Sequence, residues 1–241
     1  MTNWYHIETG QIGYPQPEDN FGYLKITYEP NIGCPSCHIG ISQNNPFRFK
    51  SEPKAKNLQF LGLNWVFDQI FVHESVKMAF EKNGITGISF SRPILHKSEK
   101  ELETIYQLHV DTILPEALIT DNLTAEKCKY PKDKKSLKFL KEIDSQLMKG
   151  PFCGQKKYNF PQGQKMTFDI DAFVNLPDFV RTYEWFGSGG GANRPILISE
   201  KVKNLIEVNN WRGIFLDQIK LKKKKGLFNS FLNYRIGQKF R

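Results

Sequence analysis

Four cysteines carry the most distinctive chemistry of this sequence: Cys34, Cys37, Cys128 and Cys153. Cys34 and Cys37 are separated by two residues, so one tight turn, or knuckle, can present both thiolates to the same point. Tetrahedral zinc takes four ligands, with sulfur at about 2.3 Å, and two knuckles brought together form a closed structural site. The segment Cys34–Cys37 is therefore predicted to supply half of a zinc site.

The second knuckle is incomplete. Cys153 and Gly154 match its end, but Gly150 stands where its first cysteine would be. Cys128 could supply the missing ligand through a detour of the chain, whereas His38 is a weaker candidate because it directly follows the first knuckle. We predict a zinc ion held by Cys34, Cys37, Cys153 and Cys128.

Two alternatives to zinc stay open on the sequence alone. The cysteines could be a vestigial knuckle held by packing and hydrogen bonds, or Cys34 and Cys37 could be a redox pair. A thioredoxin-like pair needs a strand-to-helix junction, because the helix N-terminus lowers the thiol pKa. The segment His38–Ser42 has the pattern of a strand instead, which disfavours redox chemistry.

No other residues form a catalytic pattern. Asp169 and Asp171 alternate with apolar residues, as on the exposed face of a strand. The run Gly187–Gly191 lacks the Gly-Lys-Ser/Thr of a phosphate loop, so we expect an ordinary loop there. We can nominate no set of nucleophile, base and orienting group, and we expect no enzyme activity. The histidines also lack metal-ligand spacing: His6, His38, His73, His96 and His109.

An internal repeat indicates the elements that position the cysteines. At an offset of 126 residues, Ile70–Phe90 aligns with Ile196–Leu216 without a gap, and eight of the 21 pairs are identical. Each copy has the pattern of a strand, a helix and a second strand entered through a glycine. The identical pairs are Ile70/Ile196, Glu74/Glu200, Val76/Val202, Lys77/Lys203, Glu81/Glu207, Asn83/Asn209, Gly87/Gly213 and Ile88/Ile214.

The predicted helices should each bury one apolar face. Asn83 and Asn209 stand where the helices should end in a left-handed residue, and Gly87 and Gly213 should open the return strands. The core-facing residues are expected to be Val76, Ala79 and Phe80 in the first copy and Val202, Leu205 and Ile206 in the second.

The predicted fold is α+β, with two pseudo-repeated strand-helix-strand units in mainly antiparallel sheet, each preceded by a cysteine knuckle. We assign residues 1–125 to the first unit, 126–219 to the second and 220–241 to a basic amphipathic tail. Between the copies we expect a strand at Glu103–Ile113 and a helix at Ser136–Met148. Aromatic residues are assigned mainly to the core, with exposed members of Phe179–Phe186 as a candidate contact patch.

Positive charge is concentrated in the tail. The chain carries a net charge of +9, but its last 26 residues hold eight Lys or Arg and one Asp, so residues 1–215 hold 26 basic and 24 acidic side chains. We therefore expect no nucleic acid bound to the body. The tail, with apolar residues of Leu227–Tyr234 on one helical face, could contact an anionic surface or dock on the body.

Nothing in the sequence predicts export or membrane insertion. The first residues lack a basic start followed by an apolar segment, and no stretch reaches the 18 or so apolar residues of a membrane span. We therefore expect a cytoplasmic protein whose cysteines are reduced thiols.

Together, the knuckles, the repeat and the segment Arg194–Val202 resemble the double-CxxCG-motif immunity proteins of polymorphic toxin systems, from about Trp4 to about Leu221. The family's first motif falls on Cys34 and Cys37, with His38 where glycine is usual. Its second falls on Cys153 and Gly154, with Gly150 in place of a cysteine.

The resemblance implies an immunity protein that binds a cognate toxin domain and neutralises it by occlusion inside the producing cell. The alternative is a zinc-knuckle protein that binds nucleic acid. That reading needs basic and aromatic residues around the knuckle, where the sequence offers Arg48 and Lys50 with Phe47 and Phe49.

Overall fold

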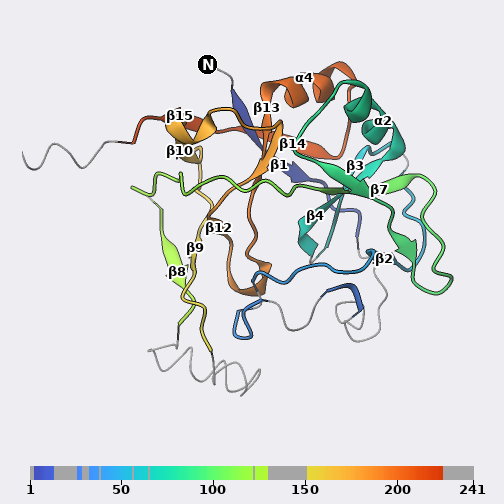
Figure 1. The fold of residues 1–241 in the computed structure, drawn as a ribbon, viewed down its shortest axis with the longest axis horizontal. Helices are drawn as coiled ribbons and strands as arrows, with labels where there is room; N and C mark the ends of the chain where they lie inside the picture. Colours follow the sequence, from blue (N-terminus) through green and yellow to red (C-terminus); the bar gives the residue numbers. More distant parts are fainter. Residues whose placement is uncertain are drawn as a thin grey trace, which may run out of the picture.

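The computed structural model describes residues 3–13, 26–28, 33–37, 39–55, 57–64, 66–121, 123–129 and 151–224 (Figure 1). Within them the chain forms two short α-helices and mostly antiparallel sheet, which confirms the α+β class. None of these helices is long and apolar enough to cross a membrane. The predicted helix Ser136–Met148, the tail beyond Lys224, His38 and Gly150 lie outside the described residues.

Two four-stranded antiparallel sheets form the centre of the fold. The first has the order β3-β4-β7-β5, and the second has the order β11-β13-β1-β14. Their strands are β3 (Phe60–Leu63), β4 (Val66–His73), β7 (Ile105–His109), β5 (Ser89–Ser91), β11 (Phe179–Arg181), β13 (Ile196–Ser199), β1 (Trp4–Thr9) and β14 (Ile214–Gln218).

Each segment of the predicted repeat folds as a strand, a helix and a strand. Helix α2 (Glu74–Lys82) follows β4 and leads to β5, and α4 (Glu200–Val208) follows β13 and leads to β14. The helices bury Val76 and Phe80 in the first copy and Val202 and Ile206 in the second, as predicted, while Ala79 and Leu205 are partly buried.

The helix ends differ from the prediction by one residue. Asn83 and Asn209 keep negative φ, because each side chain donates an Nδ2 hydrogen bond of 2.8 Å to the carbonyl four residues earlier. The left-handed residues are the next ones, Gly84 at φ 57° and Asn210 at φ 51°. The side-chain cap therefore moves the left-handed turn outward by one position.

One of the apolar clusters joins the two sheets. It contains Ile70, Val72 and Phe80 from the first segment of the predicted repeat together with Ile196 and Ile198 from the second. Since both sheets bury one face into the same core, neither is covered without the other.

The return loops of the two segments of the predicted repeat make reciprocal contacts. Gly87, at φ 83°, lies so close to Phe179 that an added Cβ would stand 2.4 Å from its carbonyl oxygen. Gly213, at φ 86°, has the same relation to Phe60, at 2.0 Å. Both positions therefore require glycine, for the backbone angle and for the close approach.

Shorter strands complete the fold. One sheet has the order β12-β9-β8, and two parallel pairs join β2 with β6 and β10 with β15. The 3-10 turn Ile170–Phe173 follows β10, and a second 3-10 turn, Gly189–Gly191, precedes β13. The short strands are β8 (Ala125–Lys127), β9 (Lys156–Tyr158), β12 (Trp185–Phe186), β2 (Arg48–Phe49), β6 (Ile94–Leu95), β10 (Thr167–Asp169) and β15 (Lys220–Lys222).

Three sequence predictions meet this topology differently. The strand predicted at Glu103–Ile113 is present but shorter, as β7. The division of the chain at residue 125 stays a prediction. Strand β1 lies before this division in the sequence, but it pairs with β13 and β14, which lie after it. The first residues of the predicted tail form β15, which pairs with β10 and so belongs to the body.

Candidate metal centre

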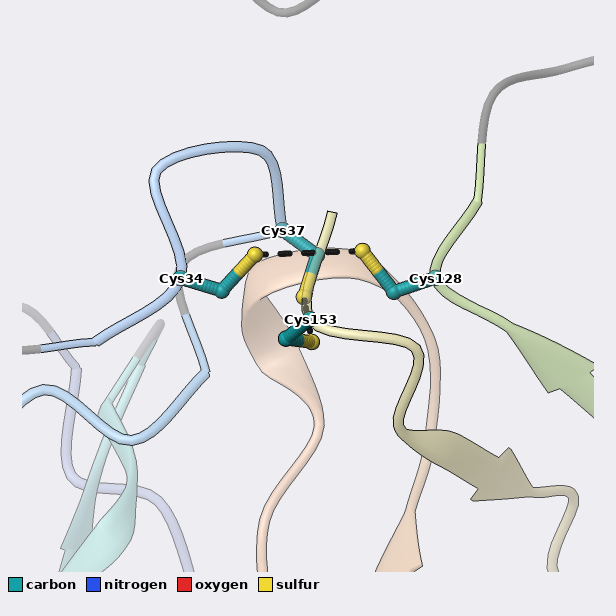
Figure 2. Close-up of side chains that lie close together, drawn as sticks. All are labelled: Cys34, Cys37, Cys128 and Cys153. Carbon is teal, nitrogen blue, oxygen red and sulfur yellow. Dashed lines mark hydrogen bonds between the residues drawn. The ribbon is translucent and has the colours of Figure 1, made fainter. Parts of the chain in front are cut away.

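The structure brings all four cysteines together. The Sγ atoms of Cys34, Cys37, Cys128 and Cys153 all lie within 4.8 Å of one another and point toward a common centre (Figure 2). Within this cluster, Cys34 Sγ lies 3.8 Å from Cys128 Sγ, and Cys37 Sγ lies 3.8 Å from Cys153 Sγ. Within the described chain, this is the one group of three or more side chains with metal-ligand spacing.

These separations fit a metal and not a disulfide. Four sulfur atoms at about 2.3 Å from a tetrahedral zinc stand about 3.8 Å from one another. A disulfide would need sulfur atoms about 2.05 Å apart, and the cysteines are free thiols. The cluster therefore has the size and the soft sulfur donors of a closed zinc site.

The first knuckle is a tight turn closed by its own backbone. Cys34 donates its backbone N–H to the Ile39 carbonyl at 2.9 Å, which brings both thiols to one side of the turn. Gly40 follows at φ 81°. This closure makes the predicted strand His38–Ser42 wrong over its described part, because residues 39–42 form a turn and loop.

The second half of the cluster comes from two neighbouring strands and not from a second CxxC turn. Cys128 directly follows β8, and Cys153 lies just before β9, which pairs with β8. Cys128 donates its backbone N–H to Gln155 at 3.0 Å, and Gly154 donates to Cys128 at 3.1 Å. Strand pairing therefore brings Cys128 into the cluster as the fourth thiol. A complete second CxxC motif would have had this thiol at position 150.

The two halves are also joined outside the sulfur atoms. The Ser36 hydroxyl donates a hydrogen bond of 2.8 Å to the Pro151 carbonyl. Cys34, Cys37 and Cys128 are each 7% exposed, whereas Cys153 is exposed. The three buried thiols pack with Ile39 and Ala192, and Phe152 and Trp185 cover the cluster from outside.

The thiols have different acidities. Burial acts to raise the pKa of Cys34, but backbone hydrogen bonds from Cys37, Ser36 and Cys153 outweigh it and lower that pKa to about 6. Burial raises the pKa of Cys37 and also that of Cys128. A cation at the centre would stabilise the thiolate form of all four, so metal binding would release protons.

Asp169 and the glycine run do not join this site. Asp169 caps the 3-10 turn that follows β10 by accepting the backbone N–H of Asp171. In the glycine run, Gly189 donates its backbone N–H to Glu126 at 3.2 Å. Both therefore have local structural roles.

Sequence reasoning missed one residue beside the cluster. Arg194 lies 4.7 Å, from its guanidinium carbon to the ring centroid, over Trp185. Trp185, which falls within the candidate contact patch Phe179–Phe186, is partly exposed at the edge of the cysteine cluster. Its distance of nine positions from Arg194 gave no periodic signal for this contact.

No protein-family model matches this chain, and a search of curated proteins finds no relative. The resemblance to the double-CxxCG immunity proteins therefore stays a prediction from the motifs.

Proposed function

We propose that this protein is an immunity protein that binds a cognate toxin domain and occludes it, with a zinc ion as part of its scaffold. The observation that carries the proposal is the cluster of Cys34, Cys37, Cys128 and Cys153, with paired sulfur atoms 3.8 Å apart. Four thiolates fill a tetrahedral zinc, so no coordination position is left for a substrate. A filled site favours a structural role, and a structural role favours function by binding.

The proposed zinc would hold together segments that are distant in the chain. Cys34 and Cys37 come from one loop, Cys128 from the end of β8, and Cys153 from the approach to β9. Binding of structural zinc contributes on the order of 10–16 kcal/mol in zinc-finger peptides at neutral pH. This is comparable with the whole stability of a typical domain, about 5–15 kcal/mol. Loss of the ion should therefore loosen this end of the molecule.

We also propose that the two central sheets are copies of one unit. Three features support this: the aligned sequences, the matching strand orders β3-β4-β7-β5 and β11-β13-β1-β14, and the reciprocal contacts of Gly87 and Gly213. In this proposal β1 takes the position in its sheet that β7 takes in the other. An experimental structure in which the eight strands and two helices fail to superpose in this correspondence would contradict it.

Affinity purification tests the immunity function. The full chain, tagged at its N-terminus, would be purified from its native cell, and co-purifying proteins would be identified by mass spectrometry. We expect one protein in stoichiometric amount, and we expect its expression alone to arrest growth unless this chain is co-expressed. A partner that is harmless when expressed alone, or no stoichiometric partner, would contradict the immunity function.

A second candidate, nucleic-acid binding, is favoured by one basic groove. This groove, of about 590 Å³, has five lysines and two acidic residues along its lining. Retention of the protein on immobilised DNA or RNA at moderate salt, falling steeply as salt rises, would support this function. The lysines are Lys156, Lys165, Lys222, Lys223 and Lys224.

A further inference from the structure

A second groove lies directly against the cysteine cluster and is lined by both of its halves. It has a volume of about 370 Å³ and includes Cys34 and Pro35 from the first knuckle and Phe152 and Cys153 from the second half. Trp185 and Arg194 form another part of its wall. We call this the knuckle groove. Its volume is near the lower end of the roughly 300–1,000 Å³ typical of ligand pockets.

Arg194 places a positive charge on the wall of the knuckle groove. Its guanidinium stacks over Trp185 at 4.7 Å and lies 5.8 Å from the ring of Tyr183. Its Nε atom is buried and has no hydrogen-bond partner among the described residues. Burial also lowers the pKa of Arg194. Leaving a buried donor on a charged group without a partner is costly, so the site favours an anion that would complete it.

The acidic residue whose charge acts on Arg194 does not fill this role. Glu184 affects Arg194 only through its longer-range charge. Its Oε1 atom instead accepts the backbone N–H groups of Ala117 and Leu118, both at 2.9 Å. Its Oε2 atom is buried without a hydrogen-bond partner among the described residues, so no hydrogen bond from Glu184 occupies the guanidinium, which is left for a carboxylate from outside the described chain.

The rest of the knuckle groove is mostly apolar, with Gln155 and the two cysteines as its other polar residues. Pro35, Ile39, Phe152 and Trp185 line it, and Arg194 is its one basic residue within the described chain. Nucleic-acid binding relies on several cations along the phosphate backbone, so a single arginine among apolar walls fits that ligand poorly. An apolar side chain beside one carboxylate fits both the walls and the charge.

We propose that the knuckle groove receives a segment of the partner protein in which an Asp or Glu lies next to an aromatic or aliphatic residue. The carboxylate pairs with Arg194, and the apolar side chain packs against Phe152 and Trp185. This inference rests on the proposed binding function and names part of the surface that the toxin would contact. Because Cys34 and Cys153 form part of the wall, the groove depends on a closed cysteine cluster.

Peptide selection tests this proposal without the toxin. A library of random dodecapeptides on phage would be panned against the zinc-loaded full chain, and the most enriched peptide would be synthesised with a fluorophore. We expect enriched sequences to carry an acidic residue next to an apolar one. We expect Arg194→Gln to weaken binding at least tenfold, while Arg212→Gln, which removes an equal charge from an exposed position, leaves binding unchanged.

The peptide itself provides the second variant. Changing its acidic residue to the corresponding amide should weaken binding to the wild-type protein by the same factor and should have no further effect on Arg194→Gln. This measurement stands even if Arg194→Gln lowers stability, because the wild-type protein is unaltered. Absence of enriched peptides, enriched peptides without an acidic residue, or equal binding by Arg194→Gln would overturn the proposal.

The same variants separate the two macromolecular ligands. If a labelled dodecathymidylate binds the wild-type chain but not the Arg194→Gln variant, the ligand of the knuckle groove is nucleic acid and not a protein segment. That result would overturn the proposal. A selected peptide that binds as expected would leave the knuckle groove established even if no toxin co-purifies, in which case only the immunity function would fail.

Discussion

Replacing Cys128 by serine is the sharpest test of the metal centre, because this cysteine completes the site only through tertiary structure. The cluster contains four thiols, and Cys128 Sγ lies 3.8 Å from Cys34 Sγ. If about 12 kcal/mol of zinc binding is shared evenly among four thiolates, each contributes about 3 kcal/mol. Since about 1.4 kcal/mol corresponds to tenfold, Cys128→Ser should weaken zinc binding by about two orders of magnitude.

The assay is competition for zinc with a chromogenic chelator at neutral pH, with bound metal measured by elemental analysis. Wild-type protein should carry about one equivalent of zinc. Ser42→Ala is the matched control, because Ser42 is exposed in the loop after the knuckle and is not a metal ligand. His38→Ala should also retain wild-type affinity. The four-thiol site would be refuted if Cys128→Ser bound zinc as tightly as the wild-type protein, and a loss in His38→Ala would identify the histidine as the ligand instead.

Three further predictions concern the metal and the core. Removing the metal with a chelator should lower the midpoint of thermal unfolding and speed hydrogen exchange in β8 and β9, while exchange in β4 stays the same. Unchanged exchange in β8 and β9 after chelation would contradict this. Gly213→Ala should lower the free energy of unfolding, measured by chemical denaturation, by about 2–4 kcal/mol, because the added Cβ would meet the Phe60 carbonyl. Gly84→Ala, with open space around the added Cβ, should lower it by about 1 kcal/mol. Equal losses in the two variants would contradict the close approach at Gly213. Burial acts to raise the pKa of Asp178, but hydrogen bonds from Ser199 and Thr86 outweigh it and lower that pKa. The ionised carboxylate therefore stabilises the fold by about 1–3 kcal/mol at pH values above its unfolded pKa. This stabilisation is lost as the pH falls through the folded pKa. Asp178→Asn should flatten acid denaturation, and an unchanged profile would count against this role.

Local chemistry accounts for the parts of the site and fold that the sequence predicted well. The two-residue spacing of Cys34 and Cys37 already requires a turn that presents both thiols together, whatever surrounds it. The helices were predicted from their apolar spacing, since burying Val76 with Phe80, or Val202 with Ile206, depends only on helical geometry. The class of fold followed from the same patterns.

The errors came from contacts between distant segments or from competing hydrogen bonds. The residues after Cys37 have strand-like composition, but the bond from Cys34 to Ile39 closes a turn there. Asn83 looked like a left-handed residue, but its side chain caps the helix and leaves that conformation to Gly84. In both cases a specific hydrogen bond outweighed a weak local preference.

By itself, the sequence determined that this protein has one complete knuckle, two similar strand-helix-strand segments and a cysteine missing from the second knuckle. Only the tertiary structure decided that Cys128 stands in for the missing residue, because the pairing of β8 with β9 brings together cysteines that are distant in the chain. It also decided that Arg194 and Trp185 meet beside the cluster. Neither contact has a periodic sequence signal, since each arises where separate segments pack against one another.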